Sequence, residues 1–109
     1  MVTTRKQAVE IAGKVRAGLE TIYAGRLRGV YLFGSAVRGQ LNEDSDIDIA
    51  IVIDRINSSF EEHERTSELG TDVSLEAGIL VNFLFIPESD LAEGRYAIYR
   101  AVRREGIPV

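Results

Sequence analysis

The sequence predicts an α/β (α+β) fold in which a small mixed β-sheet packs with helices. Apolar residues recur at helical spacing in the first segment, and three short apolar runs are typical of strands. The predicted order is helix, strand, strand, helix, strand, helix, which indicates a sandwich of a sheet and packed helices. Because the 109 residues fit one modest core, we predict a single domain over residues 1–109.

The first predicted element is an amphipathic helix over roughly the first two dozen residues. Its apolar side chains follow one another in steps of three and four: Ala8, Ile11, Ala12, Val15, Leu19, Ile22 and Tyr23. Gly25 is the expected stop, because glycine commonly ends helices.

Two strands are predicted next. Residues 30–33 form a short apolar run that ends at Gly34. Residues 34–46 are polar and contain glycine, so we expect a loop with one helical turn after Ser35. Residues 46–53 indicate a second strand. Its first half alternates polar and apolar residues, and its second half is apolar throughout, as in a strand covered on both faces.

The second half of the chain predicts helix, strand, helix. Ser58 followed by Glu61 fits a capping box that opens a helix reaching about Ala77, although Gly70 is unfavourable within it. Residues 79–86 indicate a third strand, which Pro87 should stop. A last helix carries Tyr96, Ile98, Tyr99 and Val102, and we expect Gly106 to end it, with Pro108 just beyond.

Composition excludes several kinds of site and partner. The chain has no cysteine and one histidine, so a metal must be held mainly by oxygen, which points to Mg²⁺ or Mn²⁺. The net charge of −4 argues against nucleic acid as a stable partner. Neither a membrane span nor a secretory signal is visible, so we expect a cytoplasmic protein and no membrane partner.

The C-terminal arginines and the single histidine are interpreted as surface residues without a binding role. Four arginines near the C-terminus are interpreted as a solvated helix face rather than a nucleic-acid contact: Arg95, Arg100, Arg103 and Arg104. His63 lies among glutamates and is expected to be exposed and without a role.

Asp46 and Asp48 are the candidate metal ligands. Two residues apart in a strand, they point to the same face with α-carbons roughly 6.5 Å apart. Such carboxylates repel each other, and a divalent cation removes that penalty. Taken alone, such a pair is more often two exposed aspartates where a strand begins, because the pattern is common by chance.

Gly34 and Ser35 are the candidate phosphate-binding residues. A glycine at the end of a strand lets the backbone approach a ligand closely, and N–H groups at the start of a helical turn, together with the serine hydroxyl, would face an anion. Arg38 adds a cation that could meet a phosphate, and Gly39 allows the chain to turn. Alone, Gly-Ser after a strand is usually only a turn.

Together these residues form a family pattern: Gly-Ser, ten residues, then Asp-x-Asp, on consecutive strands. The sequence resembles the DNA polymerase beta-like nucleotidyltransferase superfamily, specifically its small stand-alone members, the minimal nucleotidyltransferases. The resemblance implies the nucleotidyltransferase fold and extends from the leading helix to residues 98–106. The matching residues are Gly34, Ser35, Arg38, Gly39, Ser45, Asp46 and Asp48.

The resemblance also implies a function. Asp46 and Asp48 would be the catalytic residues and would bind Mg²⁺, or Mn²⁺, while Gly34, Ser35, Arg38 and Ser45 would bind the nucleotide. The reaction would transfer a nucleoside monophosphate, AMP from ATP, to an acceptor with loss of pyrophosphate. Relatives often sit beside a small helical HEPN protein in a toxin–antitoxin pair, so a HEPN-type toxin is the expected partner.

One position departs from the family pattern. Active members carry a third carboxylate on a later strand, where this chain has Asn82, an amide that brings no charge and cannot act as a base. Asp72 is a substitute to consider, and Asn82 could also be a buried amide bonded to backbone. The loop residues Glu43 and Asp44 are expected at the surface and could modulate metal binding. The alternatives to catalysis are a non-catalytic antitoxin or nucleotide-binding module with a decayed site, and a generic α/β binding domain.

Overall fold

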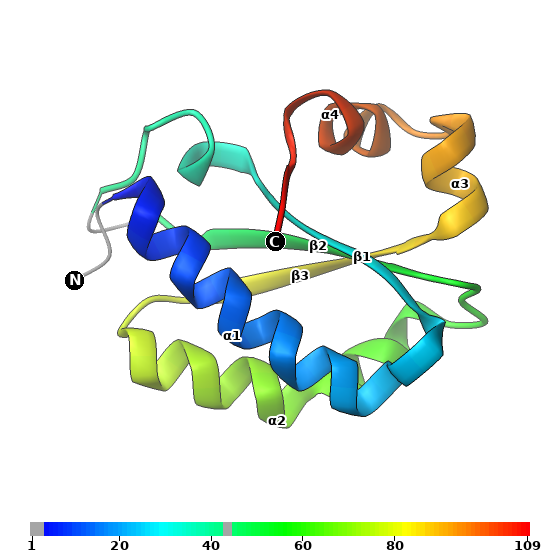
Figure 1. The fold of residues 1–109 in the computed structure, drawn as a ribbon, viewed down its shortest axis with the longest axis horizontal. Coiled ribbons are helices and arrows are strands. Elements are labelled where there is room, and N and C mark those ends of the chain that lie inside the picture. Colours follow the sequence, from blue (N-terminus) through cyan, green and yellow to red (C-terminus); the bar gives the residue numbers. More distant parts are fainter. Residues whose placement is uncertain (1–3, 43–44) are drawn as a thin grey trace.

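The computed structural model describes residues 4–42 and 45–109. They form the four-stranded sheet β3-β2-β1-β4, with helices on both faces (Figure 1). Strand β2 (Ile47–Ile53) is antiparallel to β1 (Leu27–Phe33) and parallel to β3 (Val81–Pro87), and the short β4 (Ile107–Pro108) is antiparallel to β1. The sheet is therefore mixed, which confirms the predicted fold class; the single domain over residues 1–109 stays a prediction.

Helices α1 (Arg5–Tyr23) and α2 (Ser59–Ala77) cover one face of the sheet. The core beneath them contains Val15 and Leu19 of α1 together with Ile49 and Ile51 of β2, all fully buried. The predicted apolar positions of the first helix thus face the sheet, apart from Ile22, which is only partly buried. Gly70 lies inside α2 without interrupting the helix, and a methyl group there would lie 3.3 Å from the ring of Phe83, so a small residue suits this close contact.

Helices α3 (Glu88–Glu93) and α4 (Ala97–Glu105) cover the other face. A smaller core there joins Ala50 and Val52 of β2 to Ile86 and Val102. With cores on both sides, β2 is buried at every position but Asp48, as its apolar second half predicts.

Several boundaries differ from the sequence prediction. Helix α1 ends at Tyr23, and Ala24 rather than Gly25 adopts the positive φ of 50°. Strand β3 begins two residues later than predicted, at Val81, and Pro87 is its last residue rather than the residue after it. Proline is tolerated there because β3 is an edge strand. Helix α3, β4 and the 3₁₀ turn Ala24–Arg26 were not predicted.

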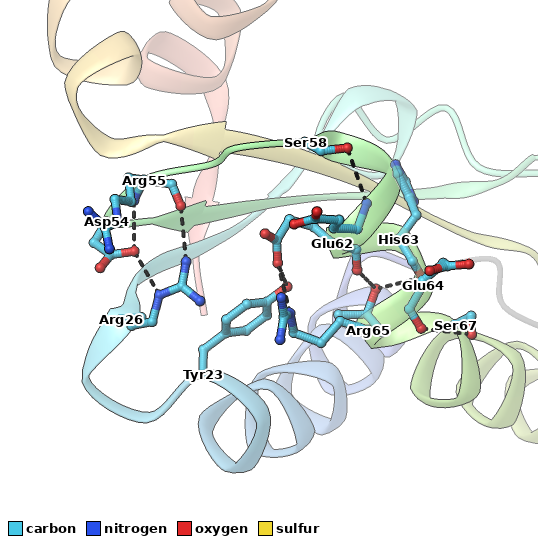
Figure 2. Close-up of polar contacts among 12 residues, drawn as sticks. Tyr23, Arg26, Asp54, Arg55, Ser58, Glu62, His63, Glu64, Arg65 and Ser67 are labelled. Carbon is cyan, nitrogen blue, oxygen red and sulfur yellow. Dashed lines mark hydrogen bonds and ion pairs between the residues drawn. The ribbon is translucent and has the colours of Figure 1, made fainter.

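A buried carboxylate ties the end of α1 to the beginning of α2 (Figure 2). Glu62 is 2% exposed and accepts hydrogen bonds from Oη of Tyr23, at 2.7 Å, and from Nε of Arg65, at 3.2 Å. Burial and the contact with Glu62 raise the pKa of the Tyr23 phenol well above its usual range. Ser58 caps α2 by accepting from the N–H of Glu61, which is the serine half of the capping box predicted there.

None of the helices in residues 4–42 and 45–109 has both the length and the hydropathy that a membrane span requires. The cytoplasmic location expected from the sequence stays a prediction.

Candidate active site

The two aspartates meet at one end of the sheet. Asp46 lies just before β2 and Asp48 is the second residue of that strand, so alternation directs both side chains to one face. Asp48 is in register with Phe33 of β1 on one side and Asn82 of β3 on the other. Nδ2 of Asn82 lies 3.0 Å from Oδ2 of Asp46 and 3.4 Å from Oδ1 of Asp48. The two carboxylates therefore converge on a single amide nitrogen.

Gly34 lies against this pair from the β1 side. Its φ is +78°, a conformation that favours glycine, and a methyl group there would lie 2.6 Å from Oδ2 of Asp48. The residue opens the 3₁₀ turn Gly34–Ala36, and its carbonyl accepts from the N–H of Val37 at 3.1 Å. The helical turn expected after Ser35 is thus present, one residue earlier. Only a residue without a side chain leaves this carboxylate free beside the backbone.

The pKa of Asp48 reflects its burial and the charges close to it. Burial raises the pKa of Asp48 above its ordinary value, and the charge of Asp46 raises it further, whereas the hydrogen bond from Asn82 and the charge of Arg38 lower it. An added cation would stabilise both carboxylates. The carboxylate oxygens are the hard donors that Mg²⁺ and Mn²⁺ prefer. The Asn82 amide nitrogen, which donates to both carboxylates, lies where a cation could contact both of them. The residues present therefore fit such an ion.

A third acidic ligand is not part of the described site. Within residues 4–42 and 45–109, no three side chains of His, Asp or Glu gather closely enough to hold a metal ion. Asp72 is exposed on α2 and does not join the aspartate pair. Glu43 and Asp44, which the sequence suggested as modulators of metal binding, lie outside the described residues.

The remaining predicted nucleotide-binding residues are placed around Gly34. Arg38 is exposed, and its guanidinium donates to Oε1 of Gln40 at 3.2 Å and to Oε2 of Glu105 at 3.3 Å. Ser35 is half-buried in the 3₁₀ turn. The hydroxyl of Ser45 accepts from the backbone N–H of Asn42 at 3.0 Å, so it helps to close the loop. The roles of all these residues in binding stay predictions.

Comparison with known proteins identifies the family. Residues 13–103 match the family described as nucleotidyltransferase domain. The chain belongs to this nucleotidyltransferase family. Two relatives from Methanocaldococcus jannaschii are named putative protein adenylyltransferases. One is 32% identical over 90 residues, which cover 81% of this chain and 83% of that protein. The other is 29% identical over 76 residues, covering 70% and 76%.

Solved structures share the nucleotidyltransferase fold. A putative nucleotidyltransferase from Sulfolobus solfataricus aligns with 99% of this chain and 86% of its own at 18% identity, with a TM-score of 0.60. A minimal nucleotidyltransferase, also described as putative, covers 94% and 95% at 24% identity, with a TM-score of 0.58. A toxin–antitoxin crystallised with AMP-PNP covers 86% and 68% at 21% identity, with a TM-score of 0.61.

Sequence reasoning missed the link between Arg38 and Glu105 in this nucleotidyltransferase. Glu105 is the last residue of α4, and β4, which begins after Gly106, pairs with Tyr31 and Leu32 of β1. That pairing brings the C-terminal segment beside the site, yet a two-residue strand leaves no periodicity to detect. The adjacent Arg104 also contacts the Glu105 carboxylate, at 3.6 Å.

Proposed function

We propose that this nucleotidyltransferase transfers AMP from ATP to a hydroxyl group of a partner protein, with Mg²⁺ or Mn²⁺ held by Asp46 and Asp48. The observation that carries the proposal is the convergence of these two carboxylates beside Gly34. The naming of two relatives as putative protein adenylyltransferases supports AMP as the transferred group and a protein as the acceptor.

The chain's own residues would do the positioning. Gly34 leaves room for the nucleotide's phosphates beside Asp48, and Ser35 adds a hydroxyl donor at the same turn. Arg38 is exposed, and its charge acts on the Asp48 carboxylate, so its guanidinium can compensate phosphate charge. The bound metal ion would neutralise charge on the phosphates and polarise the α-phosphate. Preorganised charges of this kind stabilise a transition state without reorganising during the reaction.

The partner is proposed to be a HEPN-type protein. One structural neighbour is a toxin–antitoxin crystallised with AMP-PNP, and another is described as the toxin–antitoxin MntA-HpeT carrying a mutation. Those descriptions belong to the neighbours. Their fold, which this chain shares, supports a protein partner for it, and the HEPN class follows from the family resemblance.

Metal-dependent nucleotide binding is the direct test. Calorimetry should detect ATP binding in Mg²⁺ but not in EDTA, because the phosphates need the metal's charge to lie beside two carboxylates. The variant carrying Asp46→Ala and Asp48→Ala should lose this binding. Equal ATP affinity in EDTA, or in the double variant, would refute the proposed site. Intact-mass analysis of the co-purified partner after incubation with ATP and Mg²⁺ should then show the addition of one AMP.

A second candidate function is a non-catalytic antitoxin that neutralises its partner by contact. Asn82 favours it, because the family position of the third carboxylate is neutral here and the described residues supply no substitute. In that case, the partner would be neutralised equally well without ATP and by the double aspartate variant. Loss of neutralisation under either condition would eliminate this candidate.

A further inference from the structure

Three arginines form a stripe along the outer side of α4. Arg100, Arg103 and Arg104 are exposed, and their spacing of three and four residues places them along one side of the helix. Their side chains line a hollow of about 340 Å³. Val102, on the opposite side of α4, is buried against the sheet. We call this feature the α4 arginine stripe.

Contacts within the molecule leave much of this positive charge unpaired. Arg100 donates to the carbonyl oxygen of Gly94 at 2.9 Å, which fixes the guanidinium and leaves its remaining N–H groups for another acceptor. The guanidinium of Arg104 lies 3.6 Å from the carboxylate of the neighbouring Glu105. Among the described residues, Arg103 has neither an ion-pair nor a hydrogen-bond partner. Like charges at this spacing repel one another on a helix, and an anionic partner would relieve that repulsion.

Exposed apolar side chains adjoin the stripe at the start of α4. Tyr96 is 50% exposed and Ile98 is 48% exposed. The ring of Tyr96 packs edge-on against that of Tyr99, with the centroids 5.2 Å apart, and the guanidinium of Arg95 lies 5.3 Å from the Tyr96 centroid. Tyr96 precedes Arg100 by about one helical turn and therefore extends the stripe. Exposed tyrosine and arginine side chains are typical of surfaces that bind proteins.

The charge beside the stripe favours an acidic protein segment over nucleic acid. Helix α3, which contacts α4, carries Glu88, Asp90 and Glu93 and no basic residue. The positive surface is thus short, and an extended phosphate backbone that followed it would meet these carboxylates and be repelled. A few carboxylates of a protein segment need only the stripe itself, because each guanidinium can donate two hydrogen bonds to one carboxylate.

The α4 arginine stripe lies on the same side of the sheet as the aspartate pair. Val102 of α4 lies in one core cluster with Val52 of β2, and alternation along β2 places the side chain of Asp48 on that same face. Figure 1 shows α3 and α4 together on the face opposite to α1 and α2. The end of α4 also contacts the site loop, because Glu105 accepts from Arg38 at 3.3 Å. A protein held by the stripe would therefore lie on the side of the domain that carries the proposed nucleotide site.

We propose that the α4 arginine stripe docks the partner protein through a segment rich in glutamate and aspartate, with apolar side chains between them. The carboxylates bind the three guanidinium groups, and the apolar side chains contact Tyr96 and Ile98. This inference rests on the proposed function in taking the partner to be a protein. The stripe would hold that partner whether the domain transfers AMP or neutralises by contact, so its test does not depend on catalysis.

Fluorescence anisotropy with labelled probes tests the docking surface in the absence of ATP. One probe is a synthetic peptide in which glutamate alternates with leucine. A second peptide has lysine in place of every glutamate, and an oligoribonucleotide of similar length is the third probe. The native chain should bind the glutamate peptide about tenfold or more tightly than either other probe. Because the contacts are exposed ion pairs, this binding should weaken as the NaCl concentration is raised.

The stripe variant, which carries Arg100→Gln, Arg103→Gln and Arg104→Gln, removes the charge of the stripe. It should bind the glutamate peptide about tenfold more weakly and leave the Kd of ATP with Mg²⁺ within about twofold. Arg103→Gln alone breaks no hydrogen bond or ion pair between described residues, so it should fold normally even if the stripe variant does not. It should weaken peptide binding about twofold.

The matched control removes three positive charges from α1, over the other face of the sheet. Its substitutions fall at exposed positions of that helix: Arg5→Gln, Lys6→Gln and Lys14→Gln. Because the net charge changes by the same amount as in the stripe variant, a general electrostatic effect would appear in both. The control should keep the Kd of the glutamate peptide within about twofold of the native value.

Several results would overturn the docking proposal. These are equal affinity of the native chain for the two peptides, equal affinity of the native chain and the stripe variant for the glutamate peptide, or an equal loss in the control. Tighter binding of the oligoribonucleotide, lost in the stripe variant, would instead assign the stripe to nucleic acid. Failure of the native chain to bind ATP with Mg²⁺ would overturn the proposed AMP transfer and leave the peptide-binding result standing.

Discussion

Replacing Asn82 by aspartate should make the stability of this domain depend on a divalent metal ion. The amide donates to both carboxylates of the pair, at 3.0 Å and 3.4 Å. The substitution Asn82→Asp removes both hydrogen bonds and adds a third negative charge with nearly the same shape. Without metal, the folded state should therefore be destabilised by lost hydrogen bonds and by new repulsion.

The magnitude follows from these contacts. Because Asn82 and Asp46 are exposed, solvent screening weakens these hydrogen bonds, and their loss should lower the free energy of unfolding by about 1 kcal/mol in total. Repulsion from two carboxylates at about 4 Å adds roughly 1 kcal/mol each at the dielectric constant of water. The sum of about 3 kcal/mol corresponds to a fall in Tm of roughly 12 °C for a chain of this size. Mg²⁺ at 100 times its Kd stabilises the folded state by about 2.7 kcal/mol, so the loss of stability should nearly vanish when the metal is present.

The assay is thermal unfolding in EDTA and in saturating Mg²⁺, paired with AMP transfer to the co-purified partner. Asn57→Asp is the matched control, because it makes the same change at another exposed asparagine and should show no metal-dependent Tm. Asn82→Asp should also transfer AMP faster than the native chain. If it alters neither the gain in Tm on adding Mg²⁺ nor the transfer rate, Asn82 is not at the metal site and the reasoning fails.

Three further perturbations test the surroundings of the site. Glu105→Gln should free the guanidinium of Arg38 for phosphate and tighten ATP binding with Mg²⁺ by up to about fivefold in calorimetry. Gly34→Ala should cost about 1–2 kcal/mol from its positive φ alone, and should also weaken ATP binding because the methyl group displaces the Asp48 carboxylate. Tyr23→Phe should lower the free energy of unfolding by about 2 kcal/mol at neutral pH, since the buried Glu62 loses a donor.

Each of these predictions has its own control. Glu76→Gln removes an exposed carboxylate that pairs with Lys14 and should leave ATP affinity unchanged. Gly13→Ala has open space at its β-carbon and should not destabilise the fold.

The phenol of Tyr23 keeps its proton in the folded state at pH values where the unfolded chain releases it. Native stability should therefore fall as pH rises above about 10, and Tyr23→Phe should lack this part of the fall. Identical alkaline curves would contradict the assignment.

Much of the fold was predictable because its elements carry local signals. The periodic apolar positions of α1 and the Ser58 cap of α2 depend only on neighbouring residues. Some local signals went unused: Thr4 and Gln7 form a complete capping box at the start of α1. In the six-residue α3, the acidic residues of its first turn and Gly94 at its end were also available. Strand β4 had no such signal, because only its pairing with β1 defines it.

The site was predictable in part for a related reason. The two-residue spacing of Asp46 and Asp48 fixes their common face in any strand, so the sequence places them together. The meeting of Asn82 with that pair depends on the parallel register of β2 and β3, which no local pattern encodes; the resemblance to the family suggested the position instead. The contact of Arg38 with Glu105 joins residues 67 positions apart. Neither a local pattern nor the family resemblance indicated it.

The amide at position 82 changes what the site requires when no metal is bound. A third carboxylate there would leave three negative charges facing one another, and folding would then favour the metal-bound state strongly. Asn82 instead satisfies one oxygen of each aspartate with its own N–H groups, so the pair is held together without an ion. To bind a metal, the site must give up those two hydrogen bonds. The same contact that stabilises the metal-free domain should therefore weaken its metal affinity, and this is why stability and transfer should move in opposite directions in Asn82→Asp.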